Sequence, residues 1–480
     1  MFNAQLFGQL NNLTTNNCYQ NICLVPSWKL WQWPAIRRWK EPGQASQSLQ
    51  EKNIEQKPAK SAKEESCISA EGGKTNSPSR TSRASVQISS SRPDASGQPS
   101  TIYLPVFYLP VVGRSVNDVF YAWALSKWAK TINSGDVVYS PWLYPDGVAV
   151  ERVLRGRGAR VWLMALGSDT LRLQESRCRR KIIEACSAAE GIVCVAQVLA
   201  DRLAAAGVPR EKLHVVPNGV DASLFRVRGK KELSSCSVVE LMKWGGSEEI
   251  GLNNLTTDQL SNLKLILFIG NLVPIKGPDI LLKAFAKLLE IQKSGEEKNS
   301  NMDEQDRQDR GVEVLPQSSC KSCLSMFKSI GSGHCRPSLV VIGSGSLRAK
   351  LERLARDLGI SDRVHFLGNR SHLEVARWMN VADVLCLASR NEGMPNVVLE
   401  ARASGLPVVA TPAGAIPELP LDKEHFLVVK SCNSEDLAAG LQEMLGRDLS
   451  NRKPDPAIST WGGMAERVLG LIQEKAGLSV

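Results

Sequence analysis

The sequence predicts an α/β protein with two doubly wound domains, preceded by a disordered tail. Three observations support this prediction. Residues 1–100 are largely polar, whereas from residue 101 short apolar runs alternate with helical patterns, and a second series of the same kind begins at residue 263. An order of strand, helix, strand predicts parallel sheets whose faces are covered by helices.

The tail is expected over residues 1–100. Residues 41–100 are rich in Ser, Gln, Lys, Glu, Pro and Gly, so they cannot bury enough apolar surface to offset the entropy of ordering. Residues 21–40 combine tryptophans with cations and could lie on a membrane surface, but two prolines favour irregular structure. The amino terminus lacks a secretory signal pattern, and no apolar run reaches the ~18 residues of a membrane span.

The first domain is predicted over residues 101–225. Its strands and helices alternate in "RVWLMALG", "TLRLQESRCRRKIIEACSAAE", "GIVCVA", "QVLADRLAAAG" and "KLHVVPNGVD". The polar segment 226–262 is expected to link it to the second domain.

The second domain is predicted over residues 263–456. Its strands are expected in "KLILFIG", "SLVVIGSG", "RVHFLG", "ADVLCLAS" and "PVVAT", and its helices over 278–291, 346–358, 371–380 and 395–403. The charged block 293–337 falls between a helix and a strand, so we predict an inserted surface loop there.

Composition restricts the environment and the partners. The chain has 59 Lys and Arg against 49 Asp and Glu, a net charge of +10, which favours phosphates or an anionic surface without choosing between them. The twelve cysteines are scattered in a large chain, which indicates reduced thiols inside the cell. A zinc site at Cys320, Cys323, His334 and Cys335 is disfavoured, because adjacent His and Cys ligands fit one tetrahedral ion poorly.

Ligands of open parallel sheets bind beyond the carboxyl ends of the strands. There the sequence places Asn271 and Lys276 in "NLVPIKG", and Gly343 and Gly345 in "VIGSGSL". A lysine beside a helix amino terminus suits a phosphate, and glycines allow close approach of a ligand. Taken singly, a solvated lysine and a tight turn without a ligand are the better explanations of these residues.

The stretch "NEGMPNVVLEARASG" carries two glutamates, Glu392 and Glu400. Pro395 suits the first helical position and Gly405 suits the residue past the helix end, so Glu392 precedes the helix. Glu400 is then about 7 Å along the helix at ~1.5 Å per residue. Two carboxylates so placed can bind diols at both ends of a ligand whose phosphates lie between them, as in a nucleotide sugar.

These stretches resemble the retaining glycosyltransferases of family 4, which have the GT-B fold of two Rossmann-like domains facing a cleft. "GNLVPIKGPDILLKAFAKL" and the run from "VVIGSGSLRAKL" to "GAIPE" resemble the donor domain, and Glu-x7-Glu is its most specific mark. "SPWLYPDGVAVERVLRGRGARVWLMALGSDT" and "VVPNGVDASLF" resemble the acceptor domain. "STWGGMAERVLGLIQE" resembles the closing crossover helix, expected over 457–480.

The resemblance implies retaining transfer of a sugar from a UDP- or GDP-linked donor to an acceptor hydroxyl, with no metal and no cofactor. The implied catalytic residues are Glu392, which contacts the sugar hydroxyls, Lys276, which neutralises the departing diphosphate, and Asp169, which faces the cleft. Glu400 would bind the ribose. Main-chain and side-chain contacts to the donor would come from Gly270, Asn271, Gly343, Gly393, Met394 and Asn396.

Some features depart from the family. Asn271 stands where arginine is frequent, and no first strand with a glycine loop is found before "TIYLPVFYLPVVGRS". His214 is the only histidine of the first domain, so the cleft histidine of some members is absent. The alternative is therefore a non-catalytic nucleotide-sugar-binding protein with a degenerate acceptor domain.

The expected acceptor is a carbohydrate or a lipid-linked molecule of polysaccharide, cell-envelope or glycolipid biosynthesis. We expect a cytoplasmic protein, with peripheral contact at the inner face of the membrane through Arg177, Arg179, Arg180 and Lys181 as one option. Nucleic acid is not an expected partner, since no pattern of interleaved aromatic and basic residues occurs.

Overall fold

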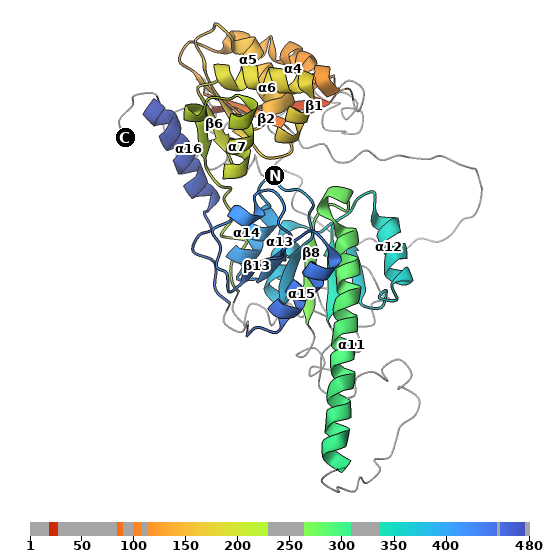
Figure 1. The fold of residues 1–480 in the computed structure, drawn as a ribbon. Coiled ribbons are helices and arrows are strands. Elements are labelled where there is room, and N and C mark those ends of the chain that lie inside the picture. Colours follow the sequence, from red (N-terminus) through yellow and green to blue (C-terminus); the bar gives the residue numbers. More distant parts are fainter. Residues whose placement is uncertain are drawn as a thin grey trace, which may run out of the picture. The chain divides into compact units, whose positions relative to one another are not determined.

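The computed structural model describes residues 19–26, 84–89, 100–107, 109, 114–228, 264–308, 337–448 and 452–475. The described residues fall into two compact units (Figure 1), one within 164–174 and 190–480 and the other within 16–163 and 175–189. The predicted linker lies outside the described residues from 229 onward, and so do the four residues of the zinc alternative.

The first sheet has seven strands in the order β3-β1-β2-β4-β5-β6-β7. Its strands are β1 (Tyr19–Pro26), β2 (Ala84–Ser89), β3 (Ser100–Val106), β4 (Val137–Ser140), β5 (Arg160–Ala165), β6 (Gly191–Cys194) and β7 (Leu213–Val215). The pairs β4–β5 and β6–β7 are parallel, as predicted, whereas β2 is antiparallel to both β1 and β4.

Strands β1 and β2 lie within residues 1–100, which were predicted as a disordered tail; the rest of residues 1–99 lies outside the described residues. Both segments lie inside that range and contain β-branched residues such as Ile22 and Val86. β1 pairs with β3, and β2 pairs with β4. Hydrogen bonds to strands distant in sequence therefore stabilise both segments, and local composition does not reveal such partners. The sheet is thus built differently from the expected acceptor domain, since β2 supplies the neighbour of β4.

The helices of this part are α4 (Asn117–Leu125), α5 (Val148–Leu154), α6 (Ser176–Ala188) and α7 (Gln197–Ala206). A fully buried carboxylate, Asp118, ties three of them together. It pairs with Arg152 of α5 and Lys181 of α6, each at 2.7 Å. Lys181 is therefore engaged inside the fold, unlike the exposed Arg177, Arg179 and Arg180, and does not belong to the basic surface that we expected.

The second sheet has six parallel strands in the order β10-β9-β8-β11-β12-β13. They are β8 (Leu265–Ile269), β9 (Ser338–Ile342), β10 (Val364–Gly368), β11 (Val384–Leu387), β12 (Val408–Ala410) and β13 (Phe426–Val428). This is the order of a doubly wound sheet. Successive strands are added on one side of β8 up to β10 and on the other side from β11 onward, so the strand order reverses between β8 and β11. The predicted α/β class is confirmed.

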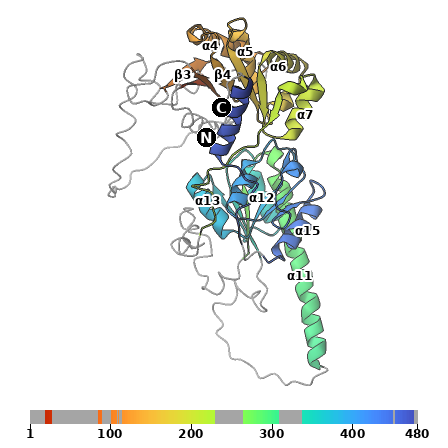
Figure 2. The same ribbon diagram turned by 90° about the vertical axis from the view of Figure 1, so that its left-hand side faces the viewer.

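Alternate residues of these strands enter two separate cores. Leu265 and Leu267 of β8 pack with α13 (His372–Val381) and α14 (Asn396–Ala403). Ile266 and Phe268 pack with α11 (Pro278–Gln308), α12 (Arg348–Asp357) and α15 (Ser434–Leu445). Figure 2 shows α13 and α15 on opposite sides of the sheet. Two-sided burial explains why the strands are almost wholly apolar.

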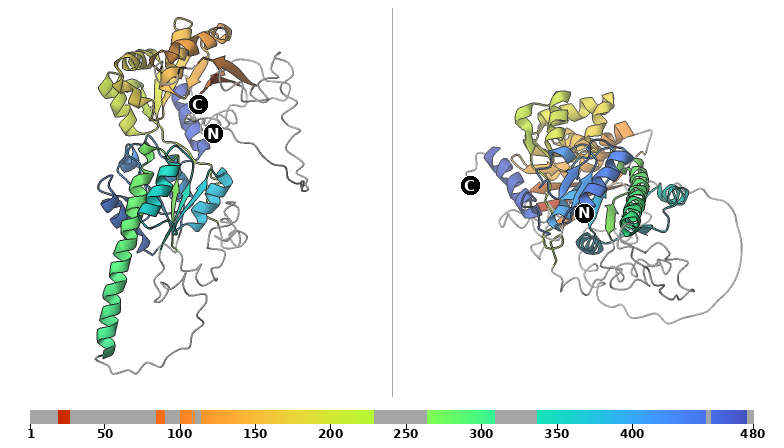
Figure 3. Two further views of the ribbon diagram at one scale, coloured as in Figure 1. Left: turned by 90° about the vertical axis from the view of Figure 1, so that its right-hand side faces the viewer. Right: turned by 60° about the horizontal axis from the view of Figure 1, so that its bottom comes forward.

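Helix α11 corrects the predicted inserted loop over 293–337. The helix continues to Gln308, so that its 31 residues extend about 46 Å, and it projects beyond the sheet (Figure 3). Low hydrophobicity suggested a loop, but Glu, Lys, Gln and Met favour helix even without a core to cover. Residues 309–336 lie outside the described residues.

The last described helix is α16 (Trp461–Lys475), which matches the predicted crossover segment in position. Among the residues that the structure describes, no helix is both long and apolar enough to cross a membrane.

Candidate nucleotide-sugar site

Three loops meet at the point where the strand order of the sheet reverses, between β8 and β11. They follow β8, β9 and β11, and hydrogen bonds join them to one another. Gly270 N donates to Ile342 O at 3.0 Å, Leu272 N to Ser344 O at 3.0 Å, and Arg390 N to Ile275 O at 2.8 Å. The sequence-predicted positions at these strand ends therefore form one site.

Two glycines allow these loops to approach so closely. Gly277 and Gly343 have φ angles of +60° and +137°, which favour glycine. A Cβ atom on Gly343 would collide with the carbonyl oxygen of Gly270, and one on Gly277 with that of Ala388. Side chains at these positions would force the loops apart.

The charged centre of the site is the pair of Lys276 and Glu392. Lys276 Nζ lies 2.6 Å from Glu392 Oε1, and Ser389 Oγ donates to the same oxygen at 2.6 Å. Glu392 is only 8% exposed, whereas Lys276 is partly exposed, so the carboxylate is the more desolvated partner. Within the described part of the chain, Glu392 Oε2 has no hydrogen-bond partner, which leaves it available to a ligand hydroxyl.

Helix α14 begins at Asn396, with Pro395 as its N-cap, one residue later than predicted. The main-chain N–H groups of Asn396 and Val397 have no acceptor among the described residues, as is normal for a first helical turn. Together with the helix dipole they favour an anion at this end. Gly405 has a φ angle of +70° just past the helix end, as predicted.

Asp169 is buried and holds the turn after β5. Its Oδ1 accepts hydrogen bonds from Gly167 N at 2.9 Å and from Thr170 N at 3.0 Å. Gly167 in turn packs directly on the backbone of Gly393. We therefore propose that Asp169 positions this turn against Gly393. The catalytic role that the resemblance implies for Asp169 stays a prediction.

The carboxyl end of α14 is held by a buried ion pair. Arg402, 1% exposed, donates through Nη1 to Leu406 O at 3.2 Å, and its Nη2 lies 3.6 Å from Asp455 Oδ2. Asp455 also accepts from the main-chain N–H groups of Asp422 and Ala457, at 2.9 and 3.0 Å. This network joins α14 to the segment that leads into α16.

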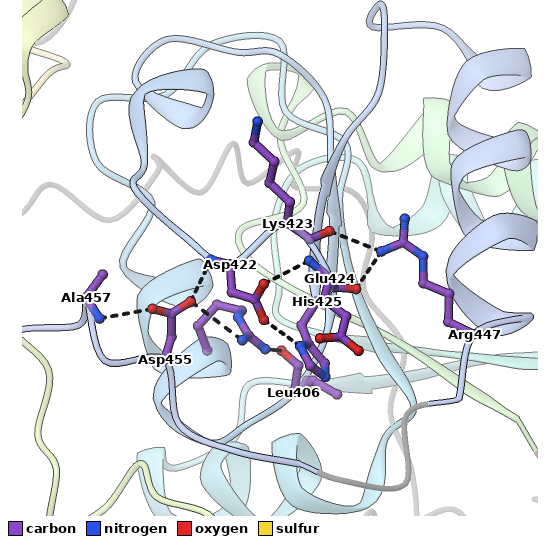
Figure 4. Close-up of polar contacts among 9 residues, drawn as sticks. Leu406, Asp422, Lys423, Glu424, His425, Arg447, Asp455 and Ala457 are labelled. Atoms are coloured by element: carbon purple, nitrogen blue, oxygen red, sulfur yellow. Dashed lines mark hydrogen bonds and ion pairs between the residues drawn. The ribbon is translucent and has the colours of Figure 1, made fainter.

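Asp422, Glu424 and His425 bring their possible metal-ligand atoms within 4.8 Å of one another. Hydrogen bonds explain their proximity. Asp422 Oδ1 accepts from Glu424 N at 2.9 Å, and Asp422 Oδ2 lies 2.7 Å from His425 Nδ1 (Figure 4). The group is a hydrogen-bonded turn, and we assign it no metal.

Two family models match the chain, one for each part of the sequence resemblance. The model described as Glycosyltransferase Family 4 matches residues 84–224, and that described as Glycosyl transferases group 1 matches residues 316–447. The chain belongs to glycosyltransferase family 4. The family predicted from the sequence is thus confirmed.

This family 4 chain is similar to the D-inositol 3-phosphate glycosyltransferase of Thermomonospora curvata, with 30% identity over 247 residues. That match covers 52% of this chain, and the chain spans only 46% of the length of its relative.

Two solved structures share the fold. Sucrose-phosphate synthase from Thermosynechococcus elongatus has a TM-score of 0.56 at 18% identity, over 79% of this chain and 84% of that one. The HepE protein of Anabaena, in complex with UDP and glucose, has a TM-score of 0.51 at 16% identity, over 78% and 82% of the two chains. Identities this low show a shared GT-B fold alone.

Sequence reasoning missed one buried polar contact at the start of α14, that of Asn218. Its Nδ2 donates to Asn396 Oδ1 at 2.6 Å, and Asn218 is 4% exposed. Asn218 lies in "VVPNGVD", which we used only as a sign of the family. An asparagine beside a glycine suggested a turn, and nothing local indicated its partner 178 positions away.

The remaining predicted donor-binding residues occupy different positions. Gly270 and Gly343 are in backbone contact, and Gly393 is covered by Gly167. The side chain of Asn271 is exposed, so a contact with a ligand would be made from the rim of the site. Met394 lines a cavity, described below.

Glu400 is partly buried, and its side-chain carboxylate has no hydrogen-bond partner among the described residues. Burial raises the pKa of its carboxyl from 4.5 to about 7. A partly buried carboxylate with no partner destabilises a fold, and such groups are concentrated at functional sites. The position on α14 is therefore consistent with a ligand-binding role.

The raised pKa predicts a pH-dependent loss of stability. The pKa of Glu400 is higher in the folded chain than in the unfolded chain, so the free energy of unfolding should be greatest below pH 4.5 and fall as the pH rises to about 7. The fall should be at most about 3 kcal/mol. Glu400→Gln should abolish this loss, as measured by urea unfolding at pH 5 and pH 8. The exposed Glu466→Gln should retain it. An equal pH dependence in Glu400→Gln would contradict the raised pKa.

Proposed function

We propose that this chain is a retaining glycosyltransferase that moves a sugar from a nucleotide diphosphate sugar to an acceptor hydroxyl. The observation that carries the proposal is the ion pair of the partly exposed Lys276 with the buried Glu392, beside the amino end of α14. Counting the described residues, a cation, N–H groups without an acceptor and a carboxylate oxygen without a donor match a diphosphate next to a sugar.

Each charged group has a distinct role in the proposed site. Lys276 and the main-chain N–H groups of Asn396 and Val397 stabilise the negative charge that develops on the departing diphosphate. Glu392 accepts hydrogen bonds from sugar hydroxyls through Oε2, while Lys276 and Ser389 hold its Oε1. Glu400 accepts from the ribose diol, which requires its ionised form.

The neutral residues shape the surroundings of the donor. Gly393 and Met394 present main-chain groups to the sugar, and Gly270, Asn271 and Gly343 border the nucleotide. No step of this scheme requires a metal or a cofactor. The complex of the similar HepE structure with UDP and glucose supports UDP as the first nucleotide to test.

The relatives support only a broad acceptor class. The similar protein of Thermomonospora curvata is a D-inositol 3-phosphate glycosyltransferase, so a hydroxylated ring or a sugar is a reasonable acceptor. We propose an acceptor of polysaccharide, cell-envelope or glycolipid biosynthesis.

One observation favours the alternative of a binding protein without transfer activity. The turn that packs against Gly393 contains Leu166 and Gly167, and neither is a histidine. His214 is the only histidine in residues 101–225. A histidine beside the donor sugar, present in some members of the family, is thus absent from this part of the sequence.

A panel of UDP- and GDP-sugars tests both functions. The chain is incubated with each donor, with and without simple sugar acceptors, and the products are followed by proton NMR. Transfer or slow hydrolysis with an initial product of unchanged anomeric configuration is expected. Inverted product would contradict the proposed reaction, and donor binding with no turnover would favour the binding protein.

A further inference from the structure

A cavity of about 310 Å³ lies in the unit that contains α14. Most of its wall is apolar and includes Val195, Val215, Met394, Leu399, Ala415 and Leu421. Its volume is at the small end of the range of about 300–1,000 Å³ found for ligand sites. The cavity suits a small molecule or one group of a larger one.

A single deeply buried polar side chain, Asn218, lines this cavity. Its Nδ2 bonds to Asn396, but its Oδ1 is buried with no hydrogen-bond partner among the described residues. Assigning the amide oxygen and nitrogen of Asn218 the other way round would still leave one atom without a partner, because Asn396 bonds to only one of the two. A buried amide atom without a partner costs about 1–3 kcal/mol, so a ligand that supplies the missing partner is favoured.

The charged lining residues do not provide a second anion site. Glu418 and Arg467 are exposed, and both are already engaged: Glu418 Oε2 accepts from Val198 N at 3.1 Å, and Arg467 Nη2 donates to Ser459 Oγ at 3.3 Å. A diphosphate would find one cation at the rim and an apolar interior. The wall fits an apolar group that carries one hydroxyl or N–H.

The cavity adjoins the proposed sugar-binding loop. Met394 lines it and is two residues from Glu392, and Asn218 joins it to Asn396 at the start of α14. We infer that the cavity binds an apolar aryl or short alkyl group of the acceptor, beside the donor sugar. This inference rests on the proposed transferase function and specifies its acceptor as an amphiphile.

Binding of two glycosides to the full chain tests the inference. In the presence of saturating UDP, phenyl β-D-glucoside should bind at least ~10-fold more tightly than methyl β-D-glucoside, since only the former has an apolar group to bury. Val215→Trp should remove this difference, because Val215 is 40% exposed and lines the cavity. The matched control Val119→Trp, 48% exposed and remote in sequence from the lining, should retain it.

Asn218→Leu provides a second variant, used with its unfolding midpoint as a check on folding. It should weaken phenyl glucoside binding by a larger factor than methyl glucoside binding, because the buried amide lines the cavity that takes the phenyl group. Equal affinities of the two glucosides in the parent, or an unchanged phenyl preference in Val215→Trp, would overturn the cavity assignment. A phenyl preference in a chain that binds no UDP would overturn the acceptor assignment together with the proposed function.

Discussion

Lys276→Ala is expected to lower kcat/KM by about 10²–10³-fold with the best nucleotide sugar of the panel. Lys276 is the only cation that the structure places against Glu392 among the described residues. Its loss removes the charge that stabilises the departing diphosphate and also leaves the largely buried Glu392 carboxylate without its counter-ion. Both effects act on the transition state, so kcat should fall more than KM rises.

Lys264→Ala is the matched control for this experiment. Lys264 precedes the same strand, β8, at its opposite end, and forms an exposed ion pair with Asp383 at 3.3 Å. Its loss should change kcat/KM by less than about twofold. Equal activities of Lys276→Ala and the parent would show that Lys276 does not contact the diphosphate.

Asp455→Ala is expected to destabilise the unit that contains α14 by about 3–5 kcal/mol, measured as a fall in the urea midpoint. Arg402 is 1% exposed, and burial lowers the pKa of its guanidinium, while Asp455 acts in the opposite direction. Removal of the carboxylate leaves this charge uncompensated and also frees two main-chain N–H groups. Asp455→Ala should also weaken nucleotide binding. Arg402 lies on α14 two residues after Glu400, so loss of its anchor should loosen the helix that carries the proposed ribose-binding carboxylate.

The exposed pair of Arg210 and Asp201, 3.2 Å apart, supplies the comparison. Asp201→Ala should shift stability by less than about 1 kcal/mol, because solvent screens both charges. If Asp455→Ala were as mild as Asp201→Ala, the Arg402 network would not anchor α14.

The second domain was more predictable from sequence than the first. Its strands are buried on both faces and are apolar throughout, and its helices α12 and α13 begin and end within two residues of the predicted positions. Strands β1 and β2 could not be found in this way, because their partners β3 and β4 are distant in sequence. The extension of α11 was missed because helix propensity, not burial, accounts for it.

The candidate site was predictable where local rules applied. Strand ends, the Pro395 and Gly405 signals and the Glu-x7-Glu spacing located Lys276, Glu392 and Glu400. Contacts between distant segments were not predictable: neither the bond from Asn218 to Asn396 nor the packing of Gly167 on Gly393 leaves a local signal. The burial of Asp169 likewise emerged only from the fold.

The most direct test of the proposed donor site is a calorimetric titration of UDP-glucose into the parent, Glu400→Ala and the control Glu466→Ala at pH 8, where the Glu400 carboxyl is ionised. The parent and Glu466→Ala should bind with equal affinity, and Glu400→Ala should bind at least ~10-fold more weakly, because the ribose diol loses a charged acceptor. Equal binding by all three proteins would contradict the assignment of α14 as the nucleotide-sugar site.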